Sequence, residues 1–106
     1  MQLHELFIRI NNRRYRVALE DILLVESSNN YCRIHTTAKK SHLVRRPLED
    51  LAGKLPNEAF FRIHKCYIIS RSHIQFFEGY NVQVNDKRLP IGRAYYNELM
   101  QKMVVV

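Results

Sequence analysis

The chain has 106 residues, of which 46% are hydrophobic and 25% are charged. This length and composition predict one globular domain, residues 1–106, that buries its own core without metal or disulfide staples. Lysine and arginine number 17 against 10 aspartate and glutamate, a formal net charge of +7, which makes a nucleic-acid partner a reasonable hypothesis. No apolar run approaches the ~20 residues of a membrane span and the N-terminal residues do not form a signal peptide, so we expect no membrane segment and a cytoplasmic protein.

The first part of the chain alternates short apolar stretches with turn residues. Residues 6–18 predict a β-hairpin that turns at Asn11–Asn12. The apolar run Ile22–Val25 predicts a strand buried on both faces, near the middle of the fold. Residues 27–30 then predict a polar turn, and residues 31–36 a further strand.

Two helices are expected among the strands. Pro47 suits a first helical turn, and the apolar residues that follow it at helical spacing predict a core-facing helix at about 47–55. Short strands separated by turn residues then predict a mostly β domain. A second helix is expected at 93–103, where Arg93 in the first turn opposes the helix dipole and therefore suggests an outside partner, such as a phosphate or a guanine edge.

Positive charge is concentrated in two stretches of the sequence. Residues 29–46 contain five basic residues and residues 62–73 contain three, and neither stretch contains an acidic residue. If the two stretches lie side by side in the fold, they build one positive face. Each phosphate that such a face neutralises makes binding more sensitive to salt.

Residues 60–71 are the centre of this pattern, because they mix strand-forming apolar side chains with basic ones and contain no acidic residue. We expect the stretch to present its donors along one rigid edge, which suits contact with a polyanion. The order Phe-x-Arg-x-His-Lys-x-Tyr-Ile-Ile at residues 60–69 resembles the signature of LytTR-type DNA-binding domains of bacterial transcription regulators. Residues 21–31, 48–56 and 89–95 are similar to other blocks of that family in order and spacing, so the resemblance covers about residues 5–103.

The resemblance implies a ten-stranded, mostly β fold with short helices at about 47–55 and 93–103. It implies the effector domain of a two-component response regulator, which binds double-stranded DNA and regulates transcription. In that family, head-to-tail copies bind tandem promoter repeats, insert loops into major grooves and bend the DNA. Such domains usually follow a receiver domain or a membrane segment, so we expect either a stand-alone regulator or an effector domain whose receiver or sensor domain is missing from this chain.

The candidate contacts divide into base-reading and phosphate-binding groups. Asn29 and Asn30 suit adenine, and Lys65 and Arg93 suit guanine, because these side chains match the hydrogen-bonding edges of those bases. The resemblance places contacts at the same positions and adds the neighbours of the two asparagines. The predicted DNA-binding residues are Ser28, Asn29, Asn30, Cys32, Arg33, Lys39, Lys40, Arg45, His64, Lys65, Arg71 and Arg93.

The sequence offers little support for an enzyme. His64 and Cys66 would share one face of a single strand at ~6 to 7 Å, and nothing identifiable orients the histidine. Zinc-binding spacings and glycine-rich phosphate loops are absent, so we expect no catalysis, metal or cofactor. Cys32 and Cys66 are expected to be free thiols; the alternative is a redox switch at Cys66, where neighbouring basic groups could lower the thiol pKa. In the family, serine is common in place of Cys66 and asparagine in place of Ser70.

Two other classes remain open. A single-stranded nucleic acid or RNA-binding β module would stack bases on aromatic side chains, although aromatics at these spacings usually belong to a core. The candidates for stacking are Tyr31, Tyr67, Phe76, Phe77 and Tyr80. A protein-interaction module that uses an exposed sheet edge would bind its partner with little dependence on salt.

Overall fold

The computed structural model describes residues 4–106, which form a mostly β fold of ten strands, two α-helices and two short 3₁₀ turns. The predicted fold class is confirmed. The strands are β1 (Glu5–Ile10), β2 (Arg13–Ala18), β3 (Ile22–Ser28), β4 (Tyr31–Thr36), β5 (Ser41–Val44), β6 (Phe60–His64), β7 (Tyr67–Ser70), β8 (Ile74–Glu78), β9 (Asn81–Val84) and β10 (Lys87–Pro90). The helices are α1 (Leu48–Ala52) and α2 (Arg93–Gln101), and the 3₁₀ turns are Leu19–Asp21 and Arg71–His73.

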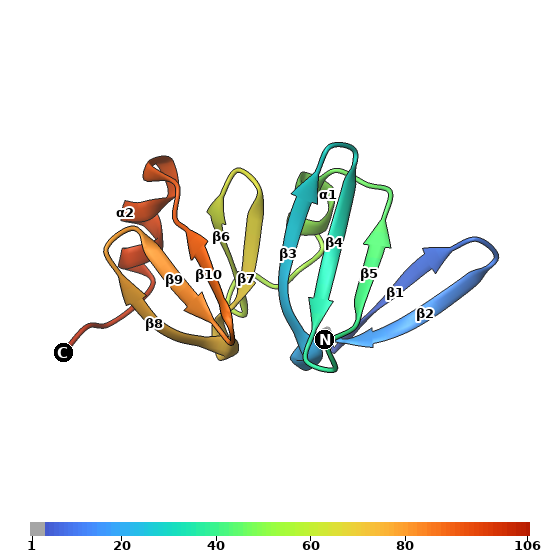
Figure 1. Ribbon diagram of the computed structural model, residues 1–106, viewed down its shortest axis with the longest axis horizontal. Helices are drawn as coiled ribbons and strands as arrows, with labels where there is room; N and C mark the ends of the chain where they lie inside the picture. The colour runs from blue at the N-terminus through green and yellow to red at the C-terminus, as the bar shows by residue number, and fades with distance from the viewer. Residues whose placement is uncertain (1–3) are drawn as a thin grey trace.

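The strands form three antiparallel sheets, which follow one another along the long axis of the molecule (Figure 1). The central sheet has the order β5-β4-β3-β7-β6, and a three-stranded sheet has the order β10-β9-β8. The hairpin β1-β2 projects at one end of the molecule, and α2 lies at the other end beside the three-stranded sheet (Figure 1). Antiparallel hairpins place alternate turns at opposite ends of a sheet, and this arrangement decides which loops can act together.

Strand β3 is the centre of the fold, as its apolar run predicts. Ile22, Leu23, Leu24 and Val25 are all buried, because both faces of the strand are covered. Val25 belongs to a core beneath α1 and the N-terminal hairpin, whereas Leu24 belongs to a second core beneath the three-stranded sheet and α2. Such a strand must be apolar on both faces, and therefore it lacks the polar alternation of an edge strand.

Both helices are shorter than the sequence predicts. Helix α1 stops at Ala52 rather than at residue 55, since Gly53 caps it and the amide of Lys54 turns to the carbonyl of Leu51 in a tighter, 3₁₀-type bond. The predicted apolar face is nevertheless correct, and Leu48, Leu51 and Leu55 are buried. Helix α2 ends at Gln101, two residues before the predicted end.

The central stretch, residues 60–71, is a hairpin and not one continuous edge. Strands β6 and β7 pair with each other, and Lys65 and Cys66 form the turn between them. The pairing register shifts between Arg62 and His64, which marks a β-bulge just before the turn. The donors therefore gather at a tip rather than along a strand, and His64 and Cys66 do not share a strand face as the sequence analysis assumed.

Candidate nucleic-acid interface

Three connections lie at the same end of the strands, along one long side of the molecule that forms the upper edge in Figure 1: the β3–β4 turn, the β6–β7 turn and the start of α2. Backbone hydrogen bonds join them. The amide of Ser27, at the end of β3, donates to the carbonyl of Cys66 at 2.8 Å, and the amide of Gly92 donates to the carbonyl of Ile63 at 2.8 Å. Segments far apart in the sequence thus form one connected surface, which we call the reading face.

The reading face carries exposed amide, hydroxyl and basic side chains. Ser28, Asn29 and Asn30 are exposed at the β3–β4 tip, Lys65 is exposed at the β6–β7 tip, and Arg93 is exposed at the first position of α2. Asn29 has a φ of 57°, in the left-handed region that asparagine tolerates better than most residues. The sequence prediction for these five residues is compatible with their placement, because the structure brings them together.

Two arginines of this end lie over aromatic rings. The guanidinium carbon of Arg93 is 5.6 Å from the ring centroid of Tyr80, and that of Arg45 is 6.0 Å from the ring centroid of Tyr31. Neither arginine forms an ion pair with a carboxylate within residues 4–106. A guanidinium on an aromatic face keeps its hydrogen-bond donors free, so both arginines remain available to an anion.

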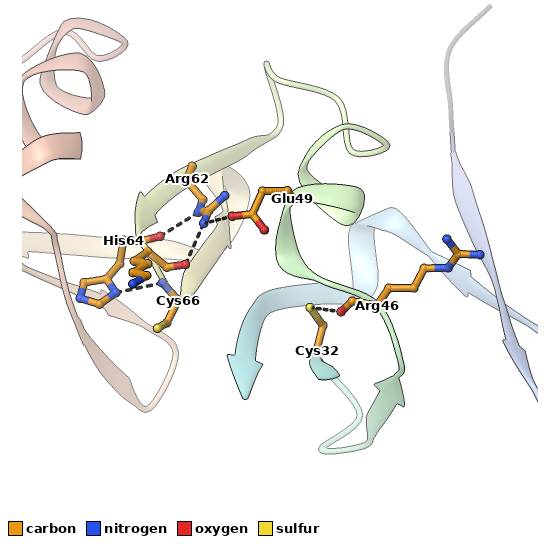
Figure 2. A network of polar contacts seen from close by, with 7 residues as sticks. Cys32, Arg46, Glu49, Arg62, His64 and Cys66 are labelled. Atoms are coloured by element: carbon orange, nitrogen blue, oxygen red, sulfur yellow. Dashed lines mark hydrogen bonds and ion pairs between the residues drawn. The ribbon is translucent and has the colours of Figure 1, made fainter. Parts of the chain in front are cut away.

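Hydrogen bonds shape the turn that carries Lys65 (Figure 2). The His64 Nδ1 atom accepts a hydrogen bond from the backbone amide of Cys66 at 3.0 Å. Arg62 donates from Nε to the carbonyl of His64 at 2.8 Å and from Nη2 to the carbonyl of Lys65 at 2.7 Å. Arg62 also meets the Glu49 carboxylate at 3.2 Å. Backbone hydrogen bonding at Glu49 itself, followed by this arginine, lowers the pKa of the Glu49 carboxyl.

The structure separates three predicted residues from the reading face. Lys39 and Lys40 lie in the β4–β5 turn, at the opposite end of the central sheet, and Arg71 follows the far end of β7 (Figure 1). Arg33 is exposed in the middle of β4, where its Nη1 donates to the Ser41 hydroxyl at 3.0 Å. His64 is half-buried at the end of β6, and its ring accepts a hydrogen bond from the amide of Cys66.

Cys32 requires a correction. Its side chain has 0% exposure, so the thiol cannot touch DNA. It points into the core and its Sγ donates to the carbonyl of Arg46 at 3.1 Å (Figure 2). Burial raises the pKa of this thiol, with a smaller contribution in the same direction from Glu49. The prediction failed because strand alternation directs Cys32 inward, while its neighbours Tyr31 and Arg33 face outward.

Arg62 is the residue of this region that the sequence analysis missed. It is the arginine of the Phe-x-Arg-x-His motif, two positions before His64, but the sequence analysis gave it no contact. Its spacing contains a usable signal, because an arginine two residues before a strand end can reach the carbonyls of the following turn. The structure also shows arginines over two tyrosine rings: the guanidinium carbon of Arg93 is 5.6 Å from the ring centroid of Tyr80, and that of Arg62 is 5.7 Å from the ring centroid of Tyr95.

The described residues offer no metal site, membrane-spanning helix or catalytic pair. No group of three or more histidine, cysteine or acidic residues that could hold a metal occurs within residues 4–106. No helix among these residues is long and apolar enough to cross a membrane. His64 accepts its hydrogen bond from the backbone amide of Cys66 and not from the thiol, so the pair is not arranged as a base and a nucleophile.

A mostly β domain that gathers amide, lysine and arginine side chains on adjoining turns has the features of a nucleic-acid-reading domain. The model of the LytTr DNA-binding domain family matches residues 12–104, and the chain belongs to this family. The resemblance drawn from the sequence is therefore confirmed.

Named relatives and a solved structure agree with this assignment. The sensory transduction protein LytR of Staphylococcus saprophyticus is 31% identical over 102 residues, which cover 91% of this chain and 40% of that protein. The sensory transduction protein LytT of Bacillus subtilis is 24% identical over 102 residues, or 91% of this chain and 42% of that protein. The chain thus spans less than half the length of these relatives. A LytTr DNA-binding domain from Bacillus cereus shares the fold, with a TM-score of 0.79, 13% identity and coverage of 95% of this chain and 97% of that one.

Proposed function

We propose that this domain binds double-stranded DNA at specific sequences and regulates transcription, with its reading face directed into major grooves. The observation that carries the proposal is that hydrogen bonds join three tips, namely the β3–β4 turn, the β6–β7 turn and the start of α2. Asn29, Lys65 and Arg93 thereby lie on one surface. Family membership supplies the class of ligand, and the geometry supplies the side chains that would meet it.

Each part of the reading face has a distinct role in this proposal. Asn29 and Asn30 would read adenine, and Lys65 and Arg93 would read the guanine acceptors O6 and N7. Arg45, with its guanidinium over Tyr31, would contact phosphate and fix the register of the domain on the duplex. Hairpin tips and a helix start are narrow enough to enter a groove about 12 Å wide, whereas the flat faces of the sheets are not.

The proposal extends to the assembly on DNA. Each copy presents one compact face, so recognition of a full promoter would use two head-to-tail copies on tandem repeats, with the DNA bent to meet the tips. The relatives are longer proteins named for sensory transduction, and the chain matches only part of them. A receiver or sensor domain joined to this one would control the binding in a protein of that length.

The test is fluorescence anisotropy with duplexes enriched from a randomised pool, matched single strands and RNA, at two salt concentrations. We expect preference for the duplex, a steep salt dependence, and a loss of base discrimination of about 1–3 kcal/mol in Arg93→Ala. Equal or tighter binding to single strands would contradict the proposal and favour stacking on exposed aromatics such as Phe76, which is 50% exposed. The absence of salt-sensitive binding to any of these nucleic acids would contradict both readings and favour a protein partner.

A further inference from the structure

We propose that Arg62 is a positioning residue for sequence discrimination: it holds the Lys65 turn in the one geometry in which all three tips read the same site. This inference rests on the DNA-binding function proposed above. Arg62 lies on β6, beneath the tip, and its side chain is only 21% exposed. It therefore acts on DNA through the groups that it holds.

Arg62 binds two consecutive carbonyls where β6 passes into the turn (Figure 2). Its Nε donates to the carbonyl of His64 at 2.8 Å and its Nη2 donates to the carbonyl of Lys65 at 2.7 Å. The planar guanidinium presents these donors in a fixed fork, which lysine cannot reproduce with a single ammonium group. The turn is thereby held at the residue whose side chain would enter the groove.

The β-bulge explains why the turn needs this support. Because the register of β6 and β7 shifts between Arg62 and His64, the regular ladder is interrupted just before the tip. At the same place the carbonyl of Ile63 accepts a hydrogen bond from the amide of Gly92, which precedes α2. The bulge thus directs one carbonyl to the helix start, and Arg62 binds the next two.

Arg62 also joins the turn to both helices. Its Nη2 is 3.2 Å from the Glu49 carboxylate of α1, and its guanidinium carbon is 5.7 Å from the ring centroid of Tyr95 in α2. A built Cβ on Gly92 would lie 3.1 Å from Tyr95 and 3.6 Å from the His64 ring, so the packing around the helix start is close. A change in the turn would consequently move Lys65 relative to Arg93. The hydrogen bond between the Ser27 amide and the Cys66 carbonyl would transmit this movement to the β3–β4 turn.

The experiment compares Arg62→Met and Arg62→Lys with the control Arg88→Met. Arg88 lies in the three-stranded sheet, where it forms an ion pair with Glu78 at 3.1 Å. The control therefore removes one arginine charge and leaves the contacts of the β6–β7 turn in place. The specificity ratio is the affinity for a duplex enriched by the wild-type domain divided by the affinity for a shuffled duplex of equal composition. It is measured at several salt concentrations, together with melting temperature and amide hydrogen exchange at Lys65 and Cys66.

We expect Arg62→Met to lower the specificity ratio at least about tenfold, since a misplaced base contact loses its discrimination. The salt slope should stay unchanged, because Arg62 does not contact phosphate. Arg62→Lys should give a smaller loss in the same direction with faster exchange at the turn, and Arg88→Met should keep the wild-type ratio. If Arg62→Met does not fold, Arg62→Lys alone decides.

Three results would overturn the inference while leaving the proposed function in place. A salt slope reduced by about 0.9 would make Arg62 a phosphate contact. An equal loss of affinity for both duplexes would make its role purely structural. A wild-type ratio in Arg62→Lys, with unchanged exchange at the turn, would show that the fork is not needed. If the wild-type domain enriches no duplex, the proposed function fails and this inference fails with it.

Discussion

The two ends of the central sheet both carry basic residues, but they differ in how those residues are connected. At the reading face, Lys65 and Arg93 lie on tips that backbone hydrogen bonds join. At the opposite end, Lys39 and Lys40 lie on the β4–β5 turn. This turn is hydrogen-bonded to the acidic 3₁₀ turn before β3, because the amide of Thr37 donates to the carbonyl of Asp21 at 2.8 Å. Charge alone does not distinguish the two ends; the connected geometry does.

An antiparallel strand explains this division. Asn30 and Thr37 flank the six residues of β4, and at ~3.3 Å per residue the strand carries the chain about 20 Å across the sheet. One uninterrupted positive stretch of sequence is thereby split between two ends that are about a DNA diameter apart. Four predictions test how far the two ends differ, from the largest expected effect to the smallest.

The largest effect is expected from removing two charges at one end or the other. Lys65→Ala with Arg93→Ala should weaken binding to the enriched duplex about a hundredfold or more, because two base contacts are lost. Lys39→Ala with Lys40→Ala should change the affinity less than about threefold at physiological salt, where charges beyond ~8 Å are screened. Anisotropy titrations of both double variants measure this. Equal losses would mean that net charge, and not the reading face, governs binding.

Asn29 and Lys39 offer a matched pair, since both have a left-handed backbone, with φ of 57° and 58°. Glycine suits this conformation, so neither Asn29→Gly nor Lys39→Gly should lose more than about 0.5 kcal/mol of stability, and Lys39→Gly should gain up to about 1 kcal/mol. Discrimination should fall only in Asn29→Gly, by about 1–3 kcal/mol. Urea unfolding and competition binding separate the two quantities, and intact discrimination in Asn29→Gly would exclude its amide from base reading.

The two cysteines should differ in how much they contribute to stability. Cys32→Ala should cost about 1 kcal/mol, because a buried group and its hydrogen bond to Arg46 are lost, whereas Cys66→Ala should stay within about 0.5 kcal/mol. Burial raises the pKa of the Cys32 thiol, so its contribution is complete below the ordinary thiol pKa and is lost as pH rises through the folded value. Urea midpoints at neutral and alkaline pH check this. A cost that grows at alkaline pH would contradict it.

The smallest effect is expected at Glu49, whose side chain is 73% exposed. The pKa of its carboxyl is lowered in the folded state, so its contribution is present above the ordinary carboxyl pKa and is lost as pH falls through the folded value. Glu49→Gln should therefore lower the melting temperature slightly at neutral pH and not at all in acid. A difference that increases toward acid pH would show that the ion pair with Arg62 does not stabilise the fold.

The sequence by itself determined the elements and the family. The apolar run Ile22–Val25 predicted the central strand, helical spacing predicted the buried face of α1, and the motif at residues 60–69 predicted the LytTR-type family, because each signal is local. Helix ends were less accurate, since Gly53 and the last turn of α2 depend on weak capping bonds.

Only the tertiary structure decided which residues lie together. Period-two alternation shows that Cys32 and Arg33 face opposite sides of β4, but the packing of α1 against one side determines that Cys32 is buried. Likewise, the sequence shows Arg62 as one more positive charge, whereas its hydrogen bonds place it beneath the Lys65 turn. Contacts between segments far apart in the chain leave no periodic pattern, and for this reason the reading face becomes visible only once the sheets are assembled.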